Sequence, residues 1–293
     1  GQFEIVPFLL DQLGDRRMSD VIRAQIPIAL GRLGEASRPV LPVLLQMAQS
    51  RKTSNPVRQS CIVALGQLAV PEDAEVIEEL MRLIQKSNEH ASSNFAFVAL
   101  GEIGARAARD CGRHCDVLRQ LDRFLLRQLT RSRRQNQLPW AATACALVGR
   151  AYPSDAPARK VYADKLTDRW RDTRNPAHCG ALAVALGLIE AREAGPELLE
   201  ALQDSSDRRY NGHVAEALGM MRHEEALPEL KELLESDNDA EYRVQIATAL
   251  GLMGDLEVSK LLVDEITRAK TLWVTSSVAR ALGNVGDRTA IQP

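Results

Sequence analysis

Aromatic residues make up only 4% of this 293-residue chain, so large rings cannot dominate its core. Hydrophobic residues still make up 45% and charged residues 26%, which is normal for a folded protein and far from the disordered class. Leucine, alanine, valine and isoleucine must therefore fill the interior. This composition favours thin layers of closely packed helices over a thick globular core.

Long apolar runs and a cysteine framework are also missing. The apolar stretches are far shorter than the roughly 20 residues that cross a bilayer, so we expect no membrane span. No signal peptide is visible, although the chain starts at Gly1 rather than Met, which is compatible with a removed signal. An odd number of cysteines at irregular spacing excludes a disulfide framework and favours a reducing, cytoplasmic location: Cys61, Cys111, Cys115, Cys145 and Cys179.

The tripeptide Ala-Leu-Gly recurs along the whole chain. It occupies positions 29–31, 64–66, 99–101, 185–187, 217–219, 249–251 and 281–283, and Ala146-Leu147-Val148 fills the one gap. The third residues of these eight tripeptides are spaced by 35, 35, 47, 39, 32, 32 and 32 positions. Such regular self-similarity is typical of a repeat architecture.

Each repeat has the pattern of two helices, most clearly in the seventh. Residues 224–234 carry apolar side chains at helical period, residues 235–239 form an acidic turn, and residues 240–253 form a second helix that ends at Gly254. Gly34, Gly104 and Gly286 are predicted to end their helices in the same way. The sequence therefore predicts an all-α solenoid, a single array over residues 1–293 whose eight hairpins span about 3–34, 38–69, 73–104, 114–150, 157–190, 193–222, 224–254 and 257–286.

The glycine of the tripeptide lies inside the second helix, where it costs about 1 kcal/mol relative to alanine. Its repetition predicts a steric reason, namely that a neighbouring helix crosses so closely that only a hydrogen atom fits. We expect these crossings at Gly66, Gly101, Gly219 and Gly251. A single hairpin cannot bury its apolar face alone, so the hairpins must stack.

The pattern resembles HEAT repeats, in particular the short HEAT-like repeats of the phycobilin lyase E/F type. The family signature is an acidic turn, Val-Arg, and a helix ending in Ala-Leu-Gly-x-x-Gly, and it is found at 20–34, 56–66 and 239–254. The resemblance implies a ladder of acid–arginine pairs between repeats, based here on Arg23, Arg58 and Arg243. The ladder is expected to be partial, because five repeats have another residue at the arginine position: Ser93, Trp140, Cys179, Asn211 and Thr275.

The ends and the middle of the array are irregular. Neither end has a polar capping repeat, so we expect the chain to be part of a longer array. Residues 105–139 read as an insertion, with a long first helix at 115–130 and a loop at 131–137, and residues 155–172 form another long first helix after it. Insertions in solenoids often map to a binding face. A neutral insertion is the alternative.

Charge is segregated although the net charge is only −2. Residues 190–241 hold fifteen acidic and five basic residues, a net of −10, whereas residues 1–189 carry a net of +7. Arg127, Arg131, Arg133 and Arg134 form a basic cluster that an acidic partner, or the acidic repeats of a second copy, would complement. An ordinary solvated face is the alternative.

Signals for catalysis or metal binding are weak. Cys111, His114 and Cys115 lie close together, but a structural zinc site needs a fourth ligand, and none is nearby. His213, three residues before Glu216, has the side chain of a general base. A surface histidine that contacts a neighbouring carboxylate explains the pair as well. No phosphate loop or nucleophile motif occurs. We therefore expect no catalytic residue, no metal and no cofactor.

The sequence predicts a non-catalytic scaffold or adaptor that binds a protein partner. The second helices are expected to line the binding face, with six exposed candidates: Phe95, Arg209, His213, Glu216, Glu241 and Gln245. One alternative is a nucleic-acid-binding protein, which the arginine cluster favours and the acidic stretch opposes. The other is a bilin lyase-like enzyme subunit, which follows only from the family resemblance.

Overall fold

The structure is a computed structural model that describes residues 2–15, 17–87, 89–110, 116–131, 134–236, 239–254 and 258–286. These residues form helices and turns, and no strand occurs among them. The predicted all-α fold is thereby confirmed. The chain divides into two compact units, residues 1–162 and 163–293, which are described separately.

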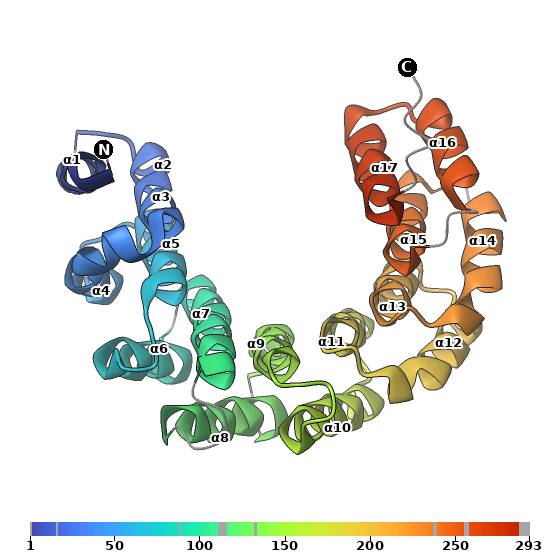
Figure 1. Cartoon of the computed structure of the whole chain (residues 1–293), viewed down its shortest axis with the longest axis horizontal. Helices are drawn as coiled ribbons and strands as arrows, with labels where there is room; N and C mark the ends of the chain where they lie inside the picture. The colour runs from blue at the N-terminus through green and yellow to red at the C-terminus, as the bar shows by residue number, and fades with distance from the viewer. Residues whose placement is uncertain are drawn as a thin grey trace. The chain divides into compact units, whose positions relative to one another are not determined.

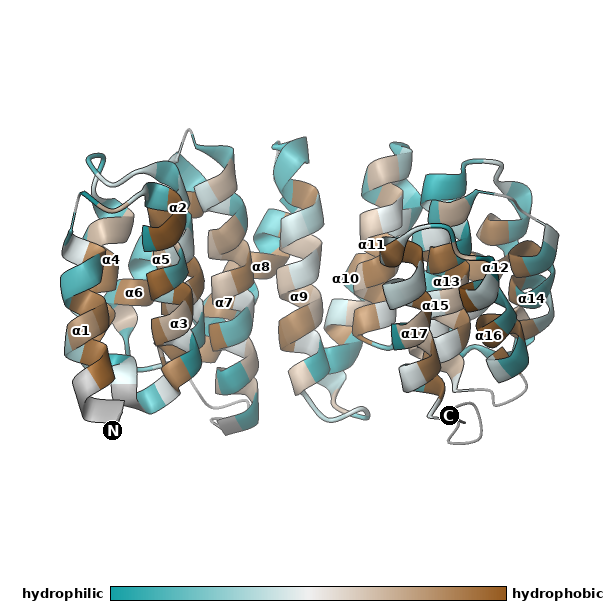
Figure 2. Cartoon of the chain, turned by 90° about the horizontal axis from the view of Figure 1, so that it is seen from above, coloured by the Kyte–Doolittle hydropathy of each residue, from teal (hydrophilic) through white to brown (hydrophobic). Residues whose placement is uncertain are grey.

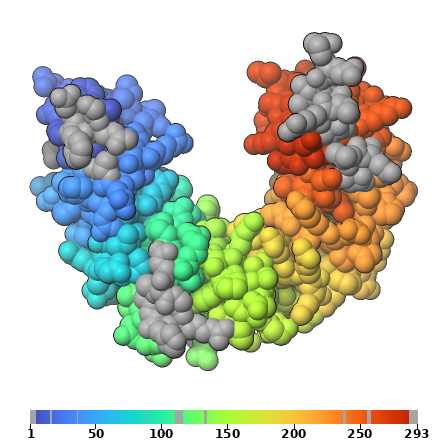
Figure 3. Space-filling view, in the orientation of Figure 1, coloured from blue at the N-terminus to red at the C-terminus, as the bar shows by residue number. Residues whose placement is uncertain are grey.

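In the first unit, successive hairpins form two rows of helices (Figure 1). The second helices α3, α5, α7 and α9 pack side by side, and the first helices α4, α6 and α8 each pack on the second helix of the same hairpin. The side chains of neighbouring hairpins are in continuous contact in Figure 3. The helices are α1 (Gln2–Gly14), α2 (Asp20–Arg23), α3 (Gln25–Leu33), α4 (Leu41–Gln49), α5 (Asn55–Leu68), α6 (Ala74–Lys86), α7 (His90–Asp110), α8 (Asp116–Arg131) and α9 (Leu138–Ala151).

The second unit repeats this arrangement. Its second helices α11, α13, α15 and α17 pack in one row, and α12, α14 and α16 each contact the second helix that follows. Figure 2 shows hydrophobic residues along the helices of both units and hydrophilic ones in many connecting turns. The helices are α11 (Pro176–Leu188), α12 (Gly195–Asp204), α13 (Arg208–Met221), α14 (Leu227–Ser236), α15 (Ala240–Met253), α16 (Val258–Arg268) and α17 (Leu272–Val285); α10 (Pro157–Asp172) connects the two units in the chain.

Local sequence sets the helix ends. Asp239 accepts a hydrogen bond from the Tyr242 backbone N–H at 2.9 Å and so caps α15, as its position in the acidic turn suggested. Gly254 follows that helix with a φ of 74°, and Gly34 and Gly286 also have positive φ values, which glycine adopts without strain. The prediction that these three residues end their helices is confirmed.

The same prediction for Gly104 is wrong. Gly104 lies inside α7, which continues to Asp110. Ala105, Ala107 and Ala108 follow it, and all three are buried, so strong helix formers with packing partners extend the helix past the glycine. Part of the expected insertion is therefore a helix extension rather than a loop.

The second helix of the first hairpin is interrupted, which the sequence pattern did not indicate. It consists of α2 and α3, separated at Ala24. Pro27 explains the break, because it has no N–H to donate to the carbonyl of Arg23 and its ring collides with that carbonyl in a regular helix.

The predicted close crossings are present between consecutive second helices. A Cβ atom placed on Gly66 would lie 2.6 Å from the Cα of Ala99, and one on Gly219 would lie 2.8 Å from the Cα of Ala249. A Cβ on Gly251 would lie 2.5 Å from the carbonyl oxygen of Ala281. In each of these pairs the alanine belongs to the tripeptide of the next repeat. The glycine of one tripeptide thus packs on the alanine of the next.

The acid–arginine ladder of the family is present in part. Arg243 on α15 pairs with Glu265 on α16, the first helix of the next repeat, and both side chains are largely buried. Arg58 on α5 lies 3.7 Å from Glu89, which precedes α7. Arg23 instead pairs with Asp20 in its own helix and donates to the Leu13 carbonyl oxygen at 3.1 Å. Two of the three arginines therefore connect neighbouring repeats.

Two residues just before α9, Arg134 and Gln137, are held against the preceding hairpin. Arg134 donates to the backbone oxygens of Ile84 and Ser87, at 3.2 and 3.4 Å, at the end of α6. Gln137 is buried and donates to Ile84 at 3.1 Å and to the Ser93 hydroxyl at 2.6 Å. These bonds satisfy carbonyls that the end of α6 leaves without helical partners.

The glycine contacts predict opposite effects for the same substitution at two equivalent positions. Gly251→Ala should destabilise the protein by about 1–3 kcal/mol, because the new methyl group meets the α17 backbone. Gly283→Ala is the matched control, since Gly283 has no described atom within 4 Å of a Cβ, and should stabilise by about 0.5–1 kcal/mol. Denaturant unfolding measures both, and equal effects would contradict the steric explanation.

The contacts of Arg134 also predict a stability difference between neighbouring arginines. Arg134→Ala should lower the free energy of unfolding by about 1 kcal/mol, because two carbonyls at the end of α6 lose a charged donor. Arg131→Ala removes an exposed arginine three residues earlier and should change it by less than about 0.5 kcal/mol. Equal thermal midpoints for the two variants would show that the connection is not held by Arg134.

Candidate protein-binding groove

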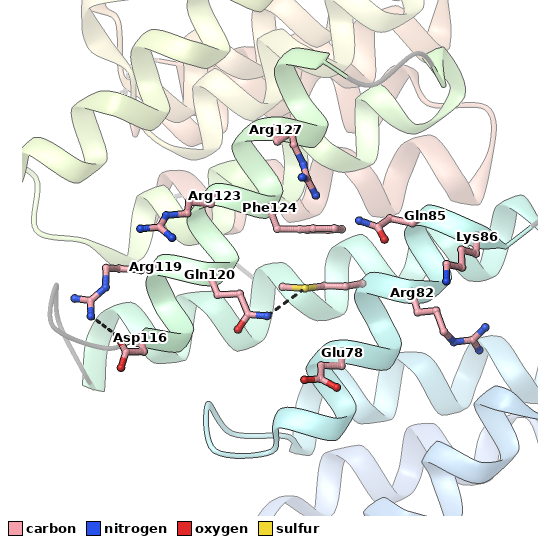
Figure 4. Close-up of a pocket in the computed structure, with 11 residues that line it drawn as sticks. Glu78, Arg82, Gln85, Lys86, Asp116, Arg119, Gln120, Arg123, Phe124 and Arg127 are labelled. Carbon is pink, nitrogen blue, oxygen red and sulfur yellow. Dashed lines mark hydrogen bonds and ion pairs between the residues drawn. The ribbon is translucent and has the colours of Figure 1, made fainter.

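A groove of about 800 Å³ lies between α6 and α8, two first helices of the first unit (Figure 4). Its walls are charged and polar, and its base carries one aromatic ring and one methionine. The residues that line it are Glu78, Met81, Arg82, Gln85, Lys86, Asp116, Arg119, Gln120, Arg123, Phe124 and Arg127.

The groove follows from the amphipathic pattern of its two helices. Leu80, Leu83 and Ile84 of α6 and Leu121 and Leu125 of α8 are buried against the hairpin cores. The opposite face of each helix is therefore left to polar residues. On α8 the face toward the groove carries arginines at positions 119, 123 and 127, each four residues apart and hence one above the other.

Two of the five groove cations are neutralised locally. Arg82 donates to the carboxylate of Glu79 at 2.7 Å, and that hydrogen bond raises the pKa of Arg82. Arg119 pairs with Asp116 in the first turn of α8. Both pairs join residues three apart on one helix, so they hold these side chains along their own helices.

The other three cations, Lys86, Arg123 and Arg127, are exposed and form no ion pair within the part of the chain that the structure describes. Glu78 is the remaining acidic residue in the lining, and it also has no described ion-pair partner. The groove therefore carries a positive excess, concentrated between the last turn of α6 and the middle of α8.

An apolar base accompanies this charge. The guanidinium carbon of Arg127 lies 5.9 Å from the centre of the Phe124 ring, a cation–π contact worth about 0.5–1 kcal/mol. Figure 4 shows the ring between Arg127 and Gln85. Gln120 approaches the sulfur of Met81 at 3.9 Å across the groove. Three exposed cations without an ion-pair partner among the described residues are suited to an anionic segment.

The predicted arginine cluster is only partly brought together. Arg127 lines the groove, and Arg131 is exposed at the end of α8. Arg134 is held to the end of α6, so it is a structural contact rather than a solvated charge. Arg133 lies outside the described residues, as do Cys111, His114 and Cys115. Among the described side chains, no group of three or more His, Cys, Asp or Glu residues is placed to hold a metal ion.

The candidates on the second helices are divided between the two units. Phe95 is half-buried on α7, and its ring centre lies 6.3 Å from that of Trp140 on α9. The other five lie in the second unit, where Arg209 and Glu241 are exposed at the start of α13 and α15. Glu216 is half-buried, with a carboxylate oxygen 3.9 Å from His213.

Two of these candidates pack on the preceding helix instead of projecting freely. A Cβ atom on Gly180 would lie 2.7 Å from the His213 ring, and one on Gly212 would lie 1.8 Å from the Gln245 amide oxygen. Each side chain therefore covers a glycine backbone of its neighbour. Both side chains are half-buried, and the sequence pattern, which placed them on the outward face, did not show that these two glycines leave space for them.

Sequence reasoning identified Arg127 but missed Lys86, Arg123 and Phe124. The four-residue spacing of the arginines on α8 was a usable signal for a charged helix face. The contribution of α6 had no such signal, because residues 86 and 123 come together only through the stacking of two hairpins.

No helix of the described chain is long and apolar enough to cross a membrane.

Comparisons with known proteins agree with this architecture. Residues 163–251 match the family model for HEAT repeats, and no curated protein matches the chain. A structure of Kap121p bound to Nup53p is similar to it with a TM-score of 0.55 and 15% identity, covering 98% of this chain and 34% of that chain. A Kap121p mutant gives a TM-score of 0.51 at the same identity and coverage.

Human deoxyhypusine hydroxylase in complex with glycerol aligns over 97% of both chains at 20% identity, but its TM-score of 0.38 is too low to support an inference. The chain spans about a third of the length of the Kap121p chains that it matches. At these identities the structural likeness concerns the fold alone, and the phycobilin lyase subtype stays a prediction. Residues 163–251 are thus identified as HEAT repeats by the family match, and the stacked hairpins of both units have the all-helical solenoid fold of the structural neighbours.

Proposed function

We propose that this chain is a non-catalytic scaffold whose α6–α8 groove binds an acidic segment of a protein partner. The observation that carries the proposal is the set of three exposed cations, Lys86, Arg123 and Arg127, which lack ion-pair partners among the described residues and surround Phe124. Unpaired cations close together repel each other, and an anionic ligand relieves that repulsion.

The composition of the groove favours a protein segment over a nucleic acid. Phe124 is only 5% exposed, so it cannot serve as a stacking platform for bases. Glu78 and Asp116 also lie in the groove, and their carboxylates repel a continuous phosphate backbone. A peptide can place carboxylates at the three cations and an apolar or cationic side chain elsewhere.

Catalysis has no comparable support. The groove is lined by arginine, lysine, carboxylate and amide side chains, and its described lining contains no histidine, cysteine or serine to act with a base. The bilin lyase-like alternative therefore stays an inference from family resemblance.

Further contact residues on the second helices of each unit are part of the same proposal. Phe95, Arg209, Glu216 and Glu241 present mixed aromatic and charged groups along α7, α13 and α15. Such a mixture suits recognition, because aromatic and arginine side chains dominate binding hot spots.

Peptide binding tests the groove. A fluorescein-labelled peptide of alternating glutamate and leucine should bind at low salt, as measured by fluorescence anisotropy. Arg123→Glu with Arg127→Glu should weaken it at least about tenfold, equivalent to about 1.4 kcal/mol. Arg51→Glu with Lys52→Glu is the matched control, because both residues are exposed and lie outside the groove, and should bind as the wild type does.

Three arms of this experiment separate the alternatives. A lysine–leucine peptide should not bind, which excludes binding through apolar contacts alone. Oligothymidylate should bind more weakly than the acidic peptide, whereas tighter, groove-dependent binding of the oligonucleotide would favour the nucleic-acid alternative. Phe95→Ala and Glu216→Arg should leave peptide binding unchanged but reduce capture of a full-length partner. Equal peptide affinity of the groove variant and the wild type would reject the groove.

A further inference from the structure

The second unit carries a row of carboxylates that is opposite in charge to the groove. Glu200, Glu232 and Asp264 are separated by exactly one repeat of 32 residues, and they lie on the consecutive first helices α12, α14 and α16. All three are exposed, and none forms an ion pair in the described portion of the chain.

Their helices lie side by side, so the three carboxylates form a continuous surface. Gln203 of α12 donates to the carboxylate of Glu229 on α14 at 3.2 Å, which fixes the contact between these two first helices. Figure 1 shows α16 following α14 in the same row. We call Glu200, Glu232 and Asp264 the acidic row.

The groove cations also lie on successive first helices and have the opposite charge. Lys86 lies on α6, and Arg123 and Arg127 lie on the adjacent first helix α8. Both surfaces are built from successive first helices of stacked hairpins, and one carries exposed cations where the other carries exposed carboxylates. Two such surfaces can therefore face each other with opposite charges opposed.

We infer that the α6–α8 groove binds the acidic row of a second copy of this chain. The inference rests on the proposed function, since it names one acidic protein segment for the same groove. The two surfaces differ, so the contact is heterologous: each bound copy still presents one free groove and one free row. Such contacts extend into chains or close into rings.

The contact is electrostatic, and its response to salt follows. The cations and carboxylates are exposed, and each exposed pair is weak on its own. The screening length falls from about 30 Å at 0.01 M salt to about 3 Å at 1 M. Association should therefore be strong only at low salt and depend on protein concentration.

Sedimentation velocity on the full chain tests the inference with two neutralising variants. The groove variant carries Lys86→Gln, Arg123→Gln and Arg127→Gln, and the row variant carries Glu200→Gln, Glu232→Gln and Asp264→Asn. The wild type should sediment increasingly fast with concentration at low salt and as a monomer at high salt. Each variant should stay monomeric at both, because one side of every contact is missing.

Mixing the two variants gives the decisive result. The groove variant keeps its acidic row and the row variant keeps its groove, so together they form one productive contact and no second one. The mixture should contain a one-to-one complex that does not grow further. A general effect of net charge is excluded by matched controls that change exposed residues elsewhere: Arg51→Gln, Lys52→Gln and Arg109→Gln for the groove, and Glu35→Gln, Asp155→Asn and Asp172→Asn for the row.

The outcomes separate this inference from the proposed function. A wild type that is monomeric at low salt overturns the inference, and so does self-association that both variants retain. If the acidic peptide still binds in the groove in either case, the scaffold proposal stands. Loss of both peptide binding and self-association in the wild type would reject both.

Discussion

The contact between a glycine and an alanine on neighbouring second helices is the constraint on which the rest of the structure depends. At Gly66, Gly219 and Gly251 there is no room for a Cβ atom, because the next helix approaches with its own backbone. This proximity places the intervening leucines, such as Leu218 and Leu250, in positions with no exposed surface. The cost of glycine inside a helix is thus offset by packing that a larger residue would prevent.

The same contact explains why the fold could be predicted from the sequence. A repeated small residue inside an apolar helix has few structural explanations, and its spacing shows the length of each hairpin. Departures from the repeat pattern were harder to predict, because they depend on the residues that pack around each position. Gly104 does not end its helix since buried alanines continue beyond it, whereas Gly254 has a φ of 74° and ends α15. Pro27 interrupts a helix for a local reason that the repeat pattern concealed.

The candidate site was less predictable, because its residues come from two hairpins. Arg127 and Arg134 are seven residues apart and look equivalent in the sequence. In the structure Arg127 lies over Phe124 in the groove, while Arg134 completes the hydrogen bonding at the end of α6. A cluster of like charges therefore indicates a functional surface only through those cations that have no structural partner.

The first and the second helices have different roles, and these constraints explain the difference. A second helix is packed on its neighbours of the preceding and following repeats and on its own first helix, so few of its positions can vary. A first helix such as α6 or α14 is buried mainly through one leucine-rich stripe, and its remaining face is free to carry charge. Both the cations around Phe124 and the carboxylates at 32-residue intervals lie on first helices. The first helices contribute least to the backbone contacts between repeats. Changes in binding specificity on these helices therefore have the smallest cost in stability.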